Sequence, residues 1–155
     1  MTRDSNAERG VSLRVRNATP GDAAAMARLL GELGYPADAD AMPARLAAVE
    51  SSGGSTFLVT HDDRVVGLAS VAKLSALHVD APVCYITALV AAPEARGQGV
   101  GRLLVSAAEE WARSHGCVRL SVTSAEHRAD AHAFYPRCGL PYTGRRFTKI
   151  LTSPT

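Results

Sequence analysis

The sequence predicts an α/β fold in which a mixed sheet carries helices on both faces, and two observations predict it. Short stretches in which apolar and polar residues alternate, the pattern of half-buried strands, occur from one end of the chain to the other. Between them lie stretches whose apolar residues recur at helical spacing, the pattern of amphipathic helices. The predicted order is β-α-α-β-β-β-α-β-α-β, and strands interleaved with helices in this way make a sheet covered on both sides.

The first third of the chain is predicted to form one strand and two helices. The strand covers residues 12–17, whose apolar and basic side chains alternate. The run Thr19-Pro20-Gly21-Asp22 is a helix-start signal, and the apolar residues after it keep helical spacing until Gly34-Tyr35-Pro36 stops the helix. A second, weaker helix is predicted over residues 39–50.

The middle of the chain is predicted to form three strands. Residues 56–61 and 64–72 are predicted to form the two strands of a hairpin that turns at Asp62-Asp63. A hairpin makes its two strands antiparallel neighbours. Residues 83–91 form the third strand.

The last third begins with the clearest helix, which Gly116 ends. Its apolar stripe consists of Val100, Leu103, Leu104, Ala107, Ala108 and Trp111. Beyond it, residues 118–122 alternate as a strand, and residues 129–138 form a short helix that Gly139-Leu140-Pro141 terminates. Residues 142–150 are predicted to form a final strand.

The bulk composition is that of one globular domain without a nucleic-acid or membrane partner. A chain of 155 residues can bury a core, and its net charge of +2 is too small to favour nucleic acid. Its apolar stretches fall short of the ~18–20 residues that cross a membrane, and its N-terminus lacks a signal-peptide core, so we expect a cytoplasmic protein. Residues 1–10 are polar and patternless, so we expect a disordered tail there and a single domain over residues 11–155.

The three cysteines predict neither a disulfide framework nor a metal site. Their number is odd and no CxxC spacing occurs, so free thiols in a reducing compartment are expected. Cys84 and Cys138 raise the question of an acyl-cysteine intermediate, but a thiol without a basic partner is usually inert.

The most informative segment joins the strand that ends near Ala91 to the helix after it. Here residues 93–103 place three glycines at alternate positions between Arg96 and Arg102. A glycine-rich turn that opens a helix exposes unpaired N–H groups at the positive end of the helix dipole, and lets a ligand approach without meeting a Cβ. Such a turn favours an anion, above all a pyrophosphate. The G-x-G-x-G spacing fits neither a dinucleotide-binding turn nor a P-loop, which needs a lysine.

Two motifs resemble one family. Arg96-x-x-Gly99-x-Gly101 is similar to the R/Q-x-x-G-x-G/A signature of the GNAT superfamily of acetyl-CoA-dependent N-acetyltransferases. The run Ala131-His132-Ala133-Phe134-Tyr135-Pro136-Arg137-Cys138-Gly139-Leu140 resembles a second family motif, A-x-x-F-Y-x-x-x-G-F. With the element order, the resemblance covers residues 12–150. It implies a mostly antiparallel sheet of six to seven strands with helices on both faces, and acetyl-CoA as donor.

The resemblance also implies where acetyl-CoA binds. In the family, main-chain N–H groups of the signature turn hold the pyrophosphate, a role that falls on Arg96, Gly97, Gln98, Gly99, Val100 and Gly101, with Arg102 nearby. The strand before the turn pairs with the pantetheine arm, which implies a main-chain role for Leu89, Val90 and Ala91. The N–H of Val90 or Ala91 is expected to stabilise the oxyanion of the thioester.

The resemblance places the general acid at Tyr135, where the family often has the residue that protonates the departing thiolate. Tyr135 also lies on the apolar stripe of its predicted helix, beside Phe134, which we interpret as a core residue. Packing alone is therefore the alternative role for Tyr135.

The general base stays open. Many family members carry a glutamate on the strand before the turn, at the position that Thr87 occupies here. The remaining options are a water chain, His78 before that strand, and Glu126 or His127 after the next one.

Two cues about the acceptor point in opposite directions. The connection after the first helix carries acidic and aromatic residues that would attract a cationic amine, unless it is only a solvated loop: Glu32, Tyr35, Asp38, Asp40 and Met42. The cluster Arg145-Arg146-x-x-Lys149 would instead favour an acidic acceptor, unless it only blunts an edge strand. The acceptor therefore stays open.

The resemblance implies an enzyme that transfers the acetyl group directly from acetyl-CoA to a primary amine of a small molecule or peptide, with no covalent enzyme intermediate and no metal. The alternative is a non-catalytic acyl-CoA-binding sensor or partner-binding module on the same fold, which the missing strand carboxylate favours slightly. Members of the family often dimerise, so a homodimer is a further expectation.

Overall fold

The chain divides into two compact units, Met1–Val122 and Thr123–Thr155, of which the computed structural model describes residues 12–123 and 129–152. The tail expected over residues 1–10 lies outside this description. The α-helices and strands of the first unit are β1 (Leu13–Asn17), α2 (Ala23–Leu33), α3 (Met42–Ser51), β2 (Ser55–His61), β3 (Arg64–Leu74), β4 (Val83–Ala91), α4 (Val100–Ser114) and β5 (Leu120–Val122). Three short 3-10 helices precede helices: η1 (Pro20–Asp22), η2 (Ala39–Ala41) and η3 (Pro93–Ala95). The second unit contains α5 (Ala129–Arg137).

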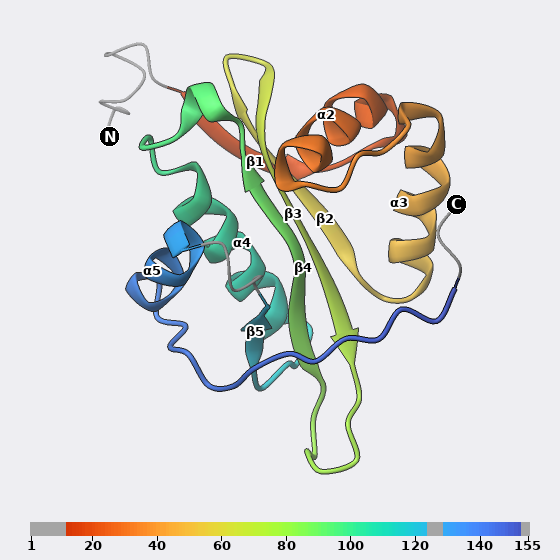
Figure 1. The fold of residues 1–155 in the computed structure, drawn as a ribbon, viewed down its shortest axis with the longest axis vertical. Helices are drawn as coiled ribbons and strands as arrows, with labels where there is room; N and C mark the ends of the chain where they lie inside the picture. Colours follow the sequence, from red (N-terminus) through yellow and green to blue (C-terminus); the bar gives the residue numbers. More distant parts are fainter. Residues whose placement is uncertain (1–11, 124–128, 153–155) are drawn as a thin grey trace. The chain divides into compact units, whose positions relative to one another are not determined.

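The first unit is built on one five-stranded sheet in the order β1-β2-β3-β4-β5. The first three pairs of neighbours are antiparallel, and β4 and β5 are parallel. Figure 1 shows α4 on one face of this sheet and α2 and α3 on the other. The predicted fold class is confirmed, with fewer strands in the described residues than the six to seven expected.

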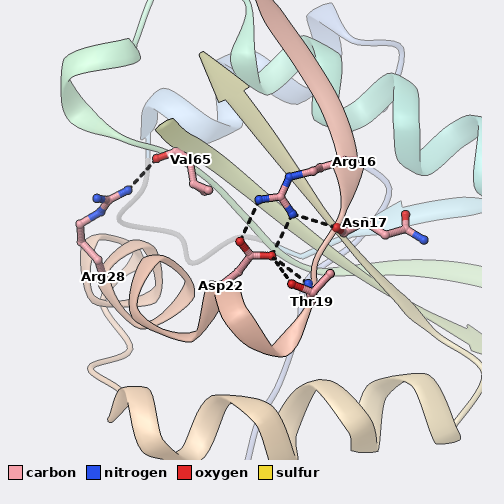
Figure 2. Close-up of polar contacts among 6 residues, drawn as sticks. All are labelled: Arg16, Asn17, Thr19, Asp22, Arg28 and Val65. Atoms are coloured by element: carbon pink, nitrogen blue, oxygen red, sulfur yellow. Dashed lines mark hydrogen bonds and ion pairs between the residues drawn. The ribbon is translucent and has the colours of Figure 1, made fainter. Parts of the chain in front are cut away.

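The start of α2 is fixed by a carboxylate that several donors share (Figure 2). Asp22 accepts two hydrogen bonds from the Arg16 guanidinium, at 2.8 and 2.9 Å, and one from the Thr19 N–H at 2.8 Å. The Arg16 hydrogen bonds, more than the Thr19 N–H, lower the pKa of Asp22 to about 2. The helix ends at Gly34, whose φ of 104° suits a glycine C-cap. Both ends of the predicted helix are thus confirmed.

The β2–β3 hairpin turns at Asp62 and Asp63, as predicted. Both residues have positive φ, 51° and 70°. This left-handed geometry is that of the two-residue turns whose twist matches a hairpin, and aspartate tolerates it better than most residues.

Apolar side chains cover both faces of the sheet. On the face of α4, Phe57, Cys84 and Ile86 form a cluster with Ala108 and Ala112 of that helix. A larger cluster combines residues of α2 and α3 with the centres of the strands and the start of α4: its members without solvent contact are Leu29, Leu58, Val59, Ala69 and Leu104. Buried side chains therefore pack α4 against the sheet along the helix, from Val100 to Ala112.

The final strand predicted over residues 142–150 is wrong: in the structure this segment has no strand, and its side chains are exposed. Tyr142, Phe147 and Ile150 are each more than seventy per cent exposed. The alternating pattern was read from side chains alone, but a strand also needs a neighbouring strand to pair its N–H and C=O groups. Within the second unit's described residues, 129–152, no strand provides that partner.

Candidate functional site

Strand β4 is paired along its whole length on one side and along only part of it on the other. Its ladder with β3 covers all of β4, whereas its parallel ladder with β5 covers Cys84–Ile86. Between Ile86 and Ala88 the β3 register skips Thr87, so Thr87 is the extra residue of a β-bulge, which bends a strand. Within residues 12–122, no strand pairs with Thr87–Ala91 on the β5 side. We call Thr87–Ala91 the open edge of β4.

The direction of each main-chain N–H decides what the open edge displays. The Ala92 N–H donates to the Val66 carbonyl across the β3 side, at 2.8 Å. Successive residues of a strand point their N–H groups to opposite sides, so the Val90 N–H points toward β3, while those of Leu89 and Ala91 point outward. Three residues are predicted to bind pantetheine. The main-chain N–H groups of Leu89 and Ala91 point to the open edge, whereas that of Val90 points to β3.

After η3, the turn needs glycine at two positions. Gly97 and Gly99 have φ of 82° and 89°, the left-handed region that side chains disfavour. A Cβ built on either residue would meet nothing within 4 Å, and Gln98 between them is also exposed. The two glycines therefore serve the shape of the turn and leave open space beside its backbone.

The turn leads into a helix whose N-terminus has no protein cap. The Leu103 N–H donates to the Gly99 carbonyl at 3.0 Å as the first helical bond, and Gly99, the N-cap residue, makes no side-chain hydrogen bond to the helix. The N–H groups of residues 100–102 precede this bond and so have no acceptor inside α4. Arg96 and Arg102 are exposed on either side of Gly97 and Gly99, and they add positive charge to the positive pole of the helix dipole. The arrangement favours an anion with several oxygens.

The segment that leads into the turn is anchored to the sheet. Glu94 in η3 pairs with Arg64 at the start of β3, at 2.7 Å. Ala95, the last residue of η3, is buried. Beside Arg64, the Val65 carbonyl accepts a hydrogen bond from Arg28 of α2 at 2.6 Å (Figure 2). The backbone just before the glycines is therefore attached to the start of β3.

Tyr135, the predicted general acid, lies on α5 in the second unit. Its ring meets that of Phe134 edge-on, with 5.3 Å between centroids, and both side chains are half-buried. The prediction that Phe134 is a core residue is not met, since no described side chain of this unit is buried. The half-buried stripe of α5 does follow the predicted positions, with Ala131 and Cys138 as its other members.

The candidates for the general base are spread over the chain. At the position where a strand glutamate is common in the family, the Thr87 hydroxyl donates to the Ser70 carbonyl at 3.2 Å. His78 is exposed on the connection between β3 and β4. Glu126 and His127 lie outside the described residues.

The acidic and aromatic set predicted for the acceptor is only partly available. Met42 is buried in the core, so its inclusion in that set was wrong. Asp38 caps η2 by accepting the Asp40 N–H at 3.0 Å. Tyr35 is 63% exposed, and Glu32 is exposed on the last turn of α2. The side chains of the connection that could contact an acceptor, the Tyr35 ring and the carboxylates, are therefore all exposed.

The thiols are placed as structural groups. Cys84 is fully buried, and burial raises the pKa of its thiol to about 11, so it is protonated at neutral pH. Burial also raises the pKa of Cys117, against the opposing effect of Lys73. A protonated, buried Cys84 is a poor nucleophile.

Residues 12–123 and 129–152 contain neither a metal-ligating cluster nor a helix suited to a membrane. No group of three or more His, Cys, Asp and Glu side chains there is arranged to hold a metal ion. In the same part of the chain, no helix has both the length and the apolar character needed to cross a membrane.

Residues 23–140 match the acetyltransferase (GNAT) family. The chain belongs to this family. The matched range begins at α2 and runs through β4, the turn and α4 to the end of the Phe134-Tyr135 motif, so it includes both motifs that carried the resemblance. As a GNAT member, the chain is an N-acetyltransferase.

Two relatives of known activity are similar over much of the chain. An aminoglycoside N(6')-acetyltransferase type 1 of Stenotrophomonas maltophilia is 36% identical over 137 residues, 84% of this chain and 88% of the relative. An aminoalkylphosphonate N-acetyltransferase of Salmonella typhimurium is 35% identical over 94 residues, 61% of each chain. Among solved structures, a Trypanosoma brucei acetyltransferase superposes with a TM-score of 0.79 at 26% identity, covering 90% of this chain and all of that one.

Proposed function

We propose that this GNAT enzyme transfers an acetyl group from acetyl-CoA directly to a primary amine of a small molecule or peptide. One observation carries the proposal: the open edge of β4 leads, through η3 and the glycine turn, to a helix N-terminus whose first N–H groups have no partner in the helix. An extended, amide-containing arm can pair with the first, and a pyrophosphate can bind at the second.

The residues present fit acetyl-CoA. The main chains of Leu89 and Ala91 offer the arm alternate N–H and C=O groups, as an adjacent strand would. The Arg96 N–H donates to the Pro93 carbonyl at 3.4 Å, so the pyrophosphate would be held by main-chain N–H groups from Gly97 to Gly101. Gly97 and Gly99 leave room for its oxygens. Arg96 and Arg102 supply counter-charge. When bound, acetyl-CoA supplies an activated thioester.

The directions of the strand N–H groups support one choice of donor to the thioester carbonyl. Because the Val90 N–H is directed toward β3, it is not available for this role. With the pyrophosphate at the turn, the thioester would lie farther back along β4. Leu89 is two residues farther from the turn than Ala91, so the Leu89 N–H is our choice for the donor to the carbonyl oxygen as negative charge develops on it.

We assign Tyr135 as the general acid that returns a proton to the thiolate of coenzyme A. The motif around it, which lies inside the range that matches the family, supports this role. The base that takes the proton from the amine is left among His78, Glu126, His127 and water. We also propose that residues 11–155 act as a single domain, because the family match crosses the boundary between the two units.

The names of the two relatives support a small, amine-bearing acceptor, an aminoglycoside in one case and an aminoalkylphosphonate in the other. The exposed carboxylates after α2 favour the more cationic of these. The test is release of coenzyme A from acetyl-CoA with a panel of aminoglycosides, aminoalkylphosphonates, polyamines, amino acids and peptides. Acceptor-dependent release with one class supports the proposal. Tight acetyl-CoA binding with no release for any amine contradicts it.

A further inference from the structure

Gly67, a residue of β3 that faces the first turn of α4, has no space for a side chain. A Cβ built on it would stand 2.4 Å from Cγ1 of Val100, 3.3 Å from Cδ1 of Leu104 and 3.5 Å from Cβ of Val59. Val100 is the first residue of α4, and both Val100 and Leu104 are buried. The first turn of α4 therefore lies on the backbone of Gly67 itself.

The closest of these contacts cannot be relieved by a small side-chain adjustment. Valine is stiff at χ1 in a helix, so its Cγ1 moves mainly with the helix backbone. Ordinary contact with a Cβ begins at 3.4 Å, which means that a side chain at position 67 would displace the first turn of α4 by about 1 Å.

Gly67 also faces the other half of the proposed site. In the β3–β4 ladder its direct partner is Ala91, one of the two residues that point main-chain groups to the open edge. One residue thus contacts the helix that would bind the pyrophosphate and pairs with the strand that would bind the pantetheine arm. The contacts of Gly67 therefore set the distance between the first turn of α4 and the open edge of β4.

We propose that Gly67 is a positioning residue for acetyl-CoA: its missing side chain sets the height of the α4 N-terminus above the sheet, in register with the open edge of β4. This inference rests on the proposed function, since it assumes that both parts bind one molecule. A ligand that spans two parts of a protein is sensitive to their spacing, because an N–H donor displaced by about 1 Å no longer lies within hydrogen-bond distance of the ligand oxygen.

The experiment measures binding of coenzyme A to the full chain by calorimetry, with thermal unfolding of each unliganded variant recorded alongside. In Gly67→Ala we expect the Kd for coenzyme A to rise about tenfold or more, the loss that corresponds to one hydrogen bond to a charged group. The KM for acetyl-CoA should rise with it, while kcat at saturating acetyl-CoA changes far less. A folded Gly67→Ala protein that binds coenzyme A within twofold of the wild type overturns the inference.

The second variant is Gly67→Ala combined with Val100→Ala, compared with Val100→Ala alone. Removing Cγ1 makes room for the new Cβ, so the double variant should bind coenzyme A within about threefold of Val100→Ala. If Gly67→Ala does not fold, rescue of folding and binding in the double variant supports the steric coupling, and failure of rescue overturns it.

Gly54→Ala is the matched control. A Cβ on Gly54 would also clash, 2.3 Å from the Val71 carbonyl, but at the start of β2 rather than at the turn. It should lower stability and leave the Kd of the folded protein unchanged, and a tenfold loss of affinity in this control would overturn the assignment to Gly67. A wild-type chain that does not bind coenzyme A contradicts the proposed function itself, before any variant is compared.

Discussion

Replacing Gly99 with glutamate should weaken coenzyme A binding while the protein stays folded. Gly99 is the N-cap of α4 with φ 89°, and a side chain there would extend into open space beside the proposed pyrophosphate. The left-handed conformation costs a non-glycine residue about 1–2 kcal/mol, part of which the carboxylate recovers by its favourable position at a helix N-terminus. We therefore expect Gly99→Glu to remain folded, with stability lower by about 1 kcal/mol.

The expected loss of affinity is larger. Two like charges ~5 Å apart repel by about 3 kcal/mol at an effective dielectric constant of 20, which corresponds to a Kd for coenzyme A more than about 100-fold higher. The assay is calorimetric titration with coenzyme A at low and at high salt, because salt screens exposed charges and should recover part of the loss.

Gly53→Glu provides the control for Gly99→Glu. Gly53 has nearly the same geometry, φ 86° with open space around a Cβ, but lies in the turn between α3 and β2. It should lose similar stability and no affinity. A folded Gly99→Glu protein that binds coenzyme A within threefold of the wild type would refute the placement of the pyrophosphate.

Two further predictions concern the acid and the start of α2. Tyr135→Phe should lower kcat by about 10²-fold and leave coenzyme A affinity unchanged, because it removes the proton and keeps the ring; turnover equal to the wild type at every pH would contradict the role of Tyr135. Asp22→Asn should lower the free energy of unfolding at pH 7 by about 1 kcal/mol, since the ion pair is partly exposed. Because the folded state holds the Asp22 pKa near 2, below its usual 3.8, this difference should be complete above pH ~4 and lost as the pH falls toward 2. Denaturant unfolding across that range is the measurement, and a difference independent of pH would disagree.

Elements set by local signals could be predicted closely from the sequence. The bounds of β4 agree with the expected 83–91, because both ends are marked by residues that break strands. The turn after it needed glycine at 97 and 99 for backbone reasons, and such needs are visible in sequence spacing. The same holds for Gly34 at the end of α2.

Features that depend on distant partners could not be predicted. The final strand failed because an alternating pattern over 142–150 says nothing about whether a neighbouring strand is present. The bulge at Thr87 and the direction of the Val90 N–H depend on the register with β3. The contact of Gly67 with Val100 joins residues thirty-three positions apart, although a glycine inside a strand pattern is a known sign of close approach by another backbone.

The open edge of β4 also bears on the tendency of the unliganded protein to aggregate. An unpaired strand edge can template association with another chain, and natural proteins usually cover such edges. Under the proposed function acetyl-CoA would be the cover, so we expect the unliganded enzyme to aggregate more readily than the enzyme with acetyl-CoA paired to the edge of the sheet. A ligand present at 100 times its Kd adds about 2.7 kcal/mol to the free energy of unfolding. The supply of acetyl-CoA would therefore govern the lifetime of the enzyme as well as its rate.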